Sequence, residues 1–344
     1  MPLIPARRGF NLTELVSGSR PARFFESDFE WMAEWGFDFA RLPLSYWYWT
    51  KPAGDWLAIE PAQFAPVDEA IRWGRRYGVH VNLCLHRIPG YCINEGPGEP
   101  FQLFSGPTDG RKKALEAAVH HWGYIAERYK EHPSSELSFD LLNEPPRMKD
   151  RSQYVEVIRA LVAAIREKDS DRVIYVDGAD LGQTPLPEVV DLDVVQSTRG
   201  YLPKSVSHHT AAWVPKDEFE TFGPLTWPLI DDFGRLWNRD LLHDELIQKW
   251  KRISDAGVSI HVGEWGCHNA APHWIALAWM SDLLALWNEA GWGWALWNLR
   301  GSFGVVDSGR ADVRYAPFRG HQLDRSMLDL LRENLSDSTR RSTM

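Results

Sequence analysis

Two apolar, strand-like runs in this chain end at or next to a glutamate. The run Leu137–Glu144 ends in Asn-Glu and is followed by a proline, and the run Ser259–Trp265 carries Glu264 as its second-last residue. Because a carboxylate is costly to remove from water, a glutamate at the tip of a core strand needs a partner or a task. Either glutamate alone could be a solvated strand end or half of an ion pair. Two such tips in one chain favour a pair of working carboxylates.

Two carboxyl groups that face each other across a cleft can cleave a glycosidic bond. One protonates the leaving oxygen, and the other attacks the anomeric carbon or activates water. The two side chains then need pKa values that their surroundings push apart. Arg41 and Tyr201 could hold Glu264 ionised by charge and hydrogen bonding, and Asn143 could donate its amide to a sugar hydroxyl beside Glu144.

The elements that must position these groups alternate between strand-like and helical patterns. Such alternation predicts a parallel sheet, and eight strands are the number that closes a barrel. The strand-like runs are Gly9–Leu15, Phe37–Leu44, His80–Arg87, Leu137–Glu144, Arg172–Asp177, Val194–Tyr201, Ser259–Trp265 and Gly293–Leu299. We therefore predict an α/β fold, a single-domain (β/α)8 TIM barrel over residues 1–335.

Amphipathic segments between these runs predict the covering helices. They are Phe25–Trp35, Pro66–Tyr77, Lys112–Lys130, Ser152–Lys168, Leu241–Ala256 and Trp274–Asn288, with a weak helical signal around Pro185–Val190. A long aromatic loop is expected near 202–240, and loops of that length in a compact domain are usually functional. Within it, Trp213 and Trp227 could stack on a sugar or pack into the core below the loop. The polar tail 336–344 is expected to fray.

In a barrel of this kind the catalytic groups lie at the carboxyl ends of the strands. Polar or aromatic residues stand at these positions in six of the eight runs: Arg41, His86, Asn143, Glu144, Arg199, Tyr201, Glu264 and Trp297. Singly, Arg41 could be a surface ion-pair partner, His86 a core histidine and Trp297 a core residue. Their joint occurrence predicts one shared site.

At this point the chain resembles the family 5 glycoside hydrolases, the cellulase and mannanase family of the retaining (β/α)8 clan. The resemblance runs from Arg8 to Asp307. The Asn143-Glu144-Pro145 motif implies that Glu144 is the acid/base, and Val262-Gly-Glu-Trp-Gly266 implies that Glu264 is the nucleophile. Further matches are Arg41 in Phe39–Pro43, His86 in Leu85–Gly90, Trp297 in Trp294–Asn298, and Tyr201 near the nucleophile.

The chain departs from the family pattern at one position. Where a histidine usually stands two residues before the tyrosine, this sequence has Arg199. Histidine titrates near neutrality and arginine does not, so the charge around the glutamates is set differently here. His208 and His209, in the following loop, could compensate. The departure concerns substrate preference more than reaction class.

The resemblance implies a retaining glycosidase that cleaves β-linked glucan-type oligosaccharides or polysaccharides. A β-mannanase, a β-mannosidase or another β-glycosidase of the same family stays open, as does a non-catalytic carbohydrate-binding barrel. An aldolase-type barrel would need a lysine at a strand end, and the eight runs have none. The sequence does not decide between glucan and mannan, or between endo and exo action. The 18 tryptophans suit stacking on sugar rings.

Charge and motifs exclude several other classes. A net charge of −9 with no basic cluster argues against nucleic acid as a partner. His268 and His273 lack the spacing of a His-Glu-x-x-His zinc motif, and no Walker loop, Gly-x-Ser-x-Gly elbow or Gly-x-Gly-x-x-Gly fingerprint occurs. We expect neither a metal nor a cofactor.

Three scattered cysteines, Cys84, Cys92 and Cys267, argue against a disulfide framework and suit a cytoplasmic protein. The sequence shows no apolar leader segment and no membrane-spanning stretch. We therefore expect a cytoplasmic location without membrane contact, or secretion if a leader has been removed. A cytoplasmic enzyme would act on imported oligosaccharides or small glycosides rather than on insoluble polymer.

Overall fold

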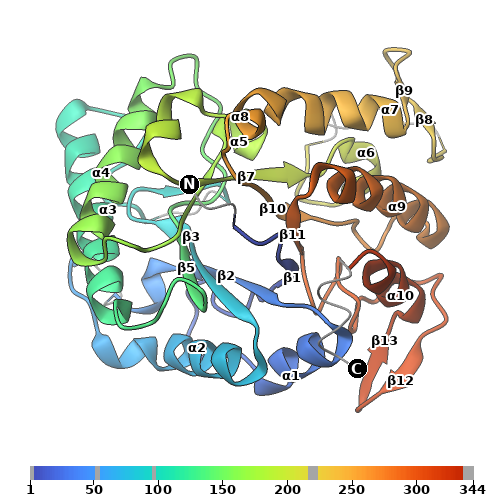
Figure 1. Cartoon of the computed structure of the whole chain (residues 1–344), viewed down its shortest axis with the longest axis horizontal. Coiled ribbons are helices and arrows are strands. Elements are labelled where there is room, and N and C mark those ends of the chain that lie inside the picture. Colours follow the sequence, from blue (N-terminus) through green and yellow to red (C-terminus); the bar gives the residue numbers. More distant parts are fainter. Residues whose placement is uncertain (1–3, 51–54, 95–97, 216–223, 336–344) are drawn as a thin grey trace.

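The strands close into a ring. The computed structural model describes residues 4–50, 55–94, 98–215 and 224–335, and within them eight parallel strands pair in chain order, with β2 joining β3 and β1 joining β11 (Figure 1). The strands are β1 (Arg8–Asn11), β2 (Phe39–Ser45), β3 (His80–Ile88), β5 (Leu137–Asp140), β6 (Ile174–Asp177), β7 (Val195–Gly200), β10 (Ile260–Trp265) and β11 (Gly293–Leu296). The predicted (β/α)8 barrel is confirmed.

Helices surround this ring (Figure 1). They are α1 (Glu26–Trp35), α2 (Ala65–Tyr77), α3 (Thr108–Tyr129), α4 (Ser152–Lys168), the 3-10 helix η3 (Pro187–Leu192), α7 (Arg239–Leu242) continuing through η5 (His243–Ile247), η6 (Gln248–Trp250) and α8 (Lys251–Asp255), α9 (His273–Ala290) and α10 (Arg325–Glu333). All six predicted helices are present, and α1 and α9 end at glycines, Gly36 and Gly291, with φ of 89° and 70°.

The short elements lie in the connections. They are η1 (Tyr46–Tyr48), η2 (Pro61–Phe64), β4 (Tyr91–Cys92), α5 (Ala179–Gly182), α6 (Lys204–Ser207), the hairpin of β8 (Leu229–Ile230) and β9 (Leu236–Trp237), and the hairpin of β12 (Ala316–Phe318) and β13 (His321–Leu323). Helix α10 was not predicted from the periodicity. It begins where the Asp324 carboxylate accepts the backbone N–H of Met327 at 3.0 Å.

The fourth predicted strand was too long. Strand β5 ends at Asp140, and the segment that follows carries Glu144 in a left-handed conformation with φ of 47°. The backbone N–H of Glu144 is bonded to the side chain of Asp177 at 2.8 Å instead of to a neighbouring strand. Glu144 therefore belongs to the loop after the strand, at the carboxyl end of the barrel.

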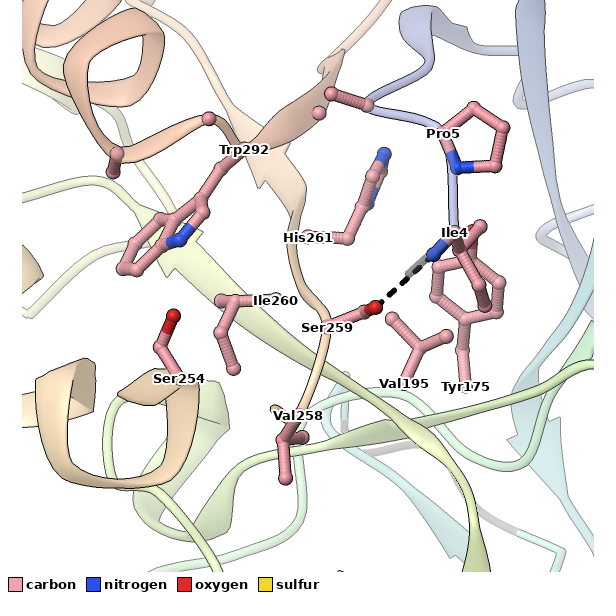
Figure 2. Close-up of a pocket in the computed structure, with 14 residues that line it drawn as sticks. Ile4, Pro5, Tyr175, Val195, Ser254, Val258, Ser259, Ile260, His261 and Trp292 are labelled. Atoms are coloured by element: carbon pink, nitrogen blue, oxygen red, sulfur yellow. Dashed lines mark hydrogen bonds between the residues drawn. The ribbon is translucent and has the colours of Figure 1, made fainter. Parts of the chain in front are cut away.

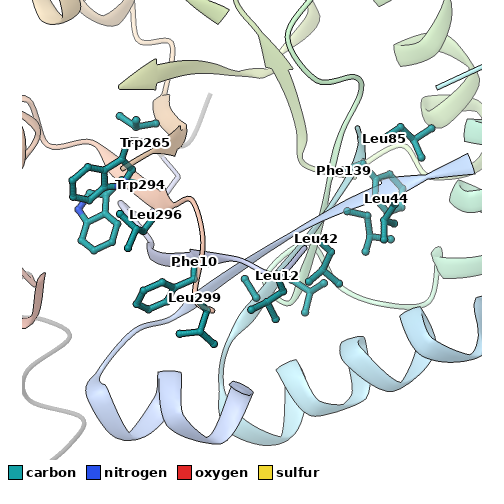
Figure 3. Close-up of a cluster of buried hydrophobic side chains, with 14 of the residues drawn as sticks. Phe10, Leu12, Leu42, Leu44, Leu85, Phe139, Trp265, Trp294, Leu296 and Leu299 are labelled. Atoms are coloured by element: carbon teal, nitrogen blue, oxygen red, sulfur yellow. The ribbon is translucent and has the colours of Figure 1, made fainter. Parts of the chain in front are cut away.

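Alternate residues of each strand face the helices or the barrel interior. The helix-facing side chains form the main core, and Figure 3 shows Phe10, Leu42 and Leu296 among them. The amino end of the interior is filled by a small apolar cluster of Phe39, Tyr175, Val195 and Ala295. Two residues further along β2, Arg41 is buried as well. The interior thus changes from apolar to charged along the barrel axis.

A small cavity of about 80 Å³ lies at the amino ends of β7, β10 and β11 (Figure 2). His261 and Trp292 line it, and the segment Ile4–Ala6 borders it, held by a hydrogen bond from the Ile4 N–H to Ser259 Oγ at 3.2 Å. This is the end of a barrel where conserved structure usually serves stability. The cavity is therefore separate from the carboxyl end that carries the two glutamates.

The long aromatic loop contributes both to the core and to the surface. Trp227 is buried, and its indole N–H donates to Asp282 at 2.8 Å, so it packs beneath the loop. Trp213 is 61% exposed. Phe219 and Phe222, which were predicted to belong to this loop, lie outside the described residues, as does the polar tail 336–344. Among the described residues, no helix is both long and apolar enough to span a bilayer.

Candidate active site

Arg41 joins the ends of four strands or their loops inside the barrel. Its guanidinium donates to Asp140 Oδ2 at 2.8 Å, to Glu264 Oε1 at 2.6 Å, to Asn143 Oδ1 at 2.8 Å and to Asn11 Oδ1 at 3.0 Å. The arginine is 1% exposed. A buried guanidinium with this many acceptors has one available geometry, so it fixes the position of the Glu264 carboxylate.

Arg199 is the second buried guanidinium, and it reaches both glutamates. Its Nε donates to Glu144 Oε1 at 3.1 Å, and its Nη2 lies 3.7 Å from Glu264 Oε1. The same group binds Asp177 through two nitrogens and donates to Asn143 Oδ1 at 2.9 Å. The two glutamates predicted from the sequence therefore face one guanidinium.

A glycine allows this approach. Strand β10 bulges at Gly263, and Glu264 then pairs with Arg199 in the register with β7. A Cβ atom at Gly263 would lie 2.5 Å from Ser197 Oγ and 2.8 Å from Arg199 Nη1. Any side chain there would displace the guanidinium, so the glycine is part of the site.

The surroundings separate the proton affinities of the two glutamates. Burial, followed by the negative charge of Glu264, raises the pKa of Glu144 to about 7. Burial would also raise the pKa of Glu264, but the charges of Arg199 and Arg41 outweigh it and hold that pKa below its ordinary value. Tyr201 adds a hydrogen bond to Glu264 Oε2 at 3.3 Å. Near neutral pH one group can hold a proton and the other can be ionised.

His86 and Trp297 lie together at the mouth of the barrel. Their rings are 5.9 Å apart and nearly parallel, with an interplanar angle of 29°. Burial lowers the pKa of His86 to about 4, so the imidazole is neutral at physiological pH. Trp297 follows β11 and is half-buried, which suits a ring that both packs and contacts a ligand.

The predicted loop residues form a cluster of rings beside Tyr201. His208 packs edge-on against Tyr201 at 4.9 Å, and Trp213 lies 6.4 Å from His208 and 5.0 Å from His268. Phe303 contacts the same rings from the loop after β11. Arg199 donates to Glu144, and His208 lies against Tyr201, so the compensating role of His208 and His209 stays a prediction.

Sequence reasoning missed three acceptors of the two arginines. Asn11, Asp140 and Asp177 end β1, β5 and β6, and all three are buried. Asp177 carried the same signal as Glu144, because it ends the apolar run Arg172–Asp177, whereas Asn11 and Asp140 lay inside predicted runs that were longer than β1 and β5. Within the described residues no cluster of three His, Cys, Asp or Glu side chains forms a possible metal site.

A closed parallel barrel with two glutamates of opposite proton affinity at its mouth defines a carbohydrate-cleaving hydrolase. A family model described as Cellulase (glycosyl hydrolase family 5) matches residues 10–302, and the chain belongs to this family. It is a β-glucanase-like glycosidase that hydrolyses O-glycosyl bonds. Membership favours an enzyme over the non-catalytic carbohydrate-binding barrel.

Curated relatives and solved structures agree with this assignment. Endoglucanase C of Acetivibrio thermocellus is 25% identical over 301 residues, covering 80% of this chain and 83% of the relative. A solved structure described as a glycoside hydrolase has a TM-score of 0.87 and 36% identity, covering 96% of this chain and all of that one. The endoglucanase Cel5A of Thermotoga maritima, at 22% identity, a TM-score of 0.74 and coverages of 95% and 97%, shares the fold.

Proposed function

We propose that this enzyme hydrolyses β-linked glucan chains with net retention, using Glu144 as the acid/base and Glu264 as the nucleophile. The observation that carries the proposal is that one guanidinium, Arg199, reaches both carboxyl groups while their pKa values shift in opposite directions. The glucan substrate is supported by relatives named Endoglucanase C and Cellodextrinase A, the latter from Ruminococcus flavefaciens, 29% identical over 195 residues and covering 55% of each chain.

In the first step, an ionised Glu264 oxygen attacks the anomeric carbon, and the bond from that carbon to the leaving oxygen breaks. Glu144 gives its proton to the leaving oxygen as the bond lengthens. The result is a glycosyl ester on Glu264, a released sugar alcohol and an ionised Glu144. Arg41 and Tyr201 hold the attacking carboxylate in place.

In the second step, the ionised Glu144 takes a proton from water, and the water oxygen attacks the anomeric carbon. The ester bond breaks, and Glu264 returns to its carboxylate form. Two inversions give net retention. When Glu144 has lost its proton, its negative charge is paired with Arg199, which donates to its Oε1.

Asn143 is the candidate for holding a substrate hydroxyl. Its Oδ1 accepts hydrogen bonds from Arg41 and Arg199, and these two donors fix the positions of the amide oxygen and nitrogen. Its Nδ2 is buried and has no partner among the described residues. A buried donor without an acceptor is costly, and a sugar hydroxyl would satisfy it.

The roles of the two glutamates can be tested by the stereochemistry of azide rescue. Glu264→Ala should lose at least about 10³-fold in kcat. Azide should then attack from the vacated face and give an α-glycosyl azide from a β-glycoside. With Glu144→Ala and an activated aryl glycoside, azide should attack the glycosyl-enzyme and give a β-glycosyl azide. The opposite pair of products would reverse the two roles, and full activity of either variant would refute the proposal.

Product analysis on a panel of β-1,4-glucan, β-1,3-glucan and β-mannan oligosaccharides tests the substrate. We expect the highest kcat/KM on a glucan. A clear preference for mannan would assign the enzyme to the β-mannanase or β-mannosidase alternative instead. The cytoplasmic location stays a prediction.

A further inference from the structure

Asp177, the last residue of β6, binds both the side chain of Arg199 and the backbone of Glu144. Its Oδ1 accepts from Arg199 Nη1 at 3.0 Å, and its Oδ2 accepts from Arg199 Nη2. The same Oδ2 accepts the backbone N–H of Glu144 at 2.8 Å. Because Arg199 Nε donates in turn to Glu144 Oε1, the three residues form a closed ring of hydrogen bonds. Asp177 is 0% exposed.

The backbone of Glu144 needs such support. Its φ of 47° is uncommon for a residue with a Cβ atom. The N–H donates to Asp177, and the carbonyl oxygen accepts from the Tyr91 hydroxyl. A buried N–H that lost its acceptor would cost free energy, and the loop would relax towards a more common conformation. The position of the Glu144 carboxyl thus depends on Asp177.

The positive charge of Arg199 also requires the Asp177 carboxylate as a counter-charge. A guanidinium stays protonated at all relevant pH values and by itself favours the ionised form of a neighbouring acid. A general acid must instead hold a proton until the leaving oxygen takes it. The two-point pair with Asp177 balances the arginine without removing its contact with Glu144.

We propose that Asp177 is a positioning residue of the reaction, which holds the Arg199 guanidinium and the Glu144 backbone in one geometry. This inference rests on the proposed role of Glu144 as the acid/base. The side chain of Asp177 binds Arg199 and the backbone of Glu144, and the proposed mechanism gives it no proton or bond of its own, so it acts through these two residues.

The other charged or titratable groups around Asp177 and Glu144 come from β2, β3, β4, β5, α4 and β10. They are Arg41, Cys84, Tyr91, Cys92, Asp140, Tyr154 and Glu264, and Tyr201 joins them from the loop after β7. Asp177→Asn leaves all of them in place and keeps an oxygen that can accept the Glu144 N–H. Removing the negative charge lowers the pKa of Glu144, because Asp177 contributes to raising it.

The test compares kcat/KM of Asp177→Asn on two glycosides with different leaving groups. A poor leaving group needs the proton from Glu144, so kcat/KM at pH 7 should fall by roughly 10- to 100-fold. A dinitrophenyl leaving group needs no proton, and its kcat/KM should change by less than about threefold. The alkaline limb of the pH profile should move to lower pH. Equal losses on both substrates with an unmoved limb would overturn the inference.

Asp169→Asn is the matched control. Asp169 pairs with Arg172, with 2.8 Å between Oδ2 and Nε, just before the amino end of the same strand. This variant also removes a carboxylate from an arginine pair, but at the end of β6 opposite to Asp177. Its pH profile and its leaving-group dependence should match those of the parent enzyme. A shift equal to that of Asp177→Asn would mean that loss of stability alone explains the effect.

Two more variants distinguish a failure of the inference about Asp177 from a failure of the proposed role of Glu144. If Asp177→Asn fails to fold, Arg199→Lys keeps the charge but cannot form the two-point pair, and it should show the same leaving-group dependence. Glu144→Gln should lose activity on the poor leaving group whatever Asp177 does. If Glu144→Gln keeps that activity, the proposed function fails. If Glu144→Gln loses this activity while Asp177→Asn and Arg199→Lys keep it, the inference about Asp177 fails and the proposed function stands.

Discussion

Arg41 and Glu264 are 223 positions apart in the chain, yet Nη1 of one lies 2.6 Å from Oε1 of the other inside the barrel. Both side chains are almost completely buried, at 1% and 6% exposure. Removing one partner of such a pair leaves an uncompensated charge and costs about 3–5 kcal/mol. Arg41 also holds Asp140, so it links the stability of the barrel to the charge of the candidate nucleophile.

Arg41→Met should reduce both stability and the working pH range. We expect the free energy of unfolding to fall by about 3–5 kcal/mol. The pKa of Glu264 should rise, because Arg41 lowers it, and the acid limb of kcat/KM should therefore move to higher pH. Denaturant unfolding and a pH profile measure the two effects. Arg159→Met, which removes an exposed pair with Asp191, should leave the free energy of unfolding nearly unchanged. An unmoved acid limb in Arg41→Met would contradict the role of Arg41.

The parent enzyme should have a bell-shaped pH profile. Activity needs Glu264 ionised and Glu144 protonated, so kcat/KM should fall as the pH rises through about 7, the pKa of Glu144. On the acid side it should fall only below the ordinary pKa of a glutamate, since the pKa of Glu264 is lowered. Glu144→Gln should abolish the alkaline limb and reduce kcat/KM on a poor leaving group by about 10²–10⁴-fold. Persistence of that limb would assign it to another group.

Gly263→Ala should disrupt the site from within the strand. The new methyl group would lie 2.5 Å from Ser197 Oγ and 2.8 Å from Arg199 Nη1, so the guanidinium must move away from both glutamates. We expect a loss of about 1–3 kcal/mol in stability and a larger proportional loss of kcat/KM. Gly123→Ala is the control, because that glycine lies inside α3 with nothing within 4 Å, and it should be neutral or stabilising. Parent-like activity of Gly263→Ala would show that the strand can shift without cost.

Alanine variants of Trp213 and Trp227 should distinguish a ring that binds substrate from a ring that packs in the core. Trp213→Ala removes a ring that is 61% exposed, so it should leave the melting temperature nearly unchanged and raise KM selectively for longer oligosaccharides. Trp227→Ala removes a buried ring and its hydrogen bond to Asp282, and it should cost about 3–5 kcal/mol. Thermal unfolding and KM as a function of chain length give both readouts. An equal KM change for short and long substrates would exclude stacking by Trp213.

Much of the barrel could be predicted because its periodicity is local. The run Phe37–Leu44 and the segment Pro66–Tyr77 each carry their pattern within one element, and β2 and α2 formed there. The prediction failed where a side chain from elsewhere decides the backbone. Residues 141–144 read as a continuing strand, and the N–H groups of Leu141 and Asn143 do still donate to the carbonyls of Tyr175 and Leu85, but the Glu144 N–H donates to the Asp177 carboxylate instead.

The sequence by itself determined which chemical groups stand at the strand ends, because strand periodicity and the Asn143-Glu144-Pro145 motif lie within single segments. It also showed an arginine at position 199. Only the tertiary structure decided how the charges pair. Arg199 meets Asp177 and both glutamates because the ring closes and because β10 bulges at Gly263 in its register with β7. Pairing between strands far apart in the chain depends on register and closure, and no single segment contains that information.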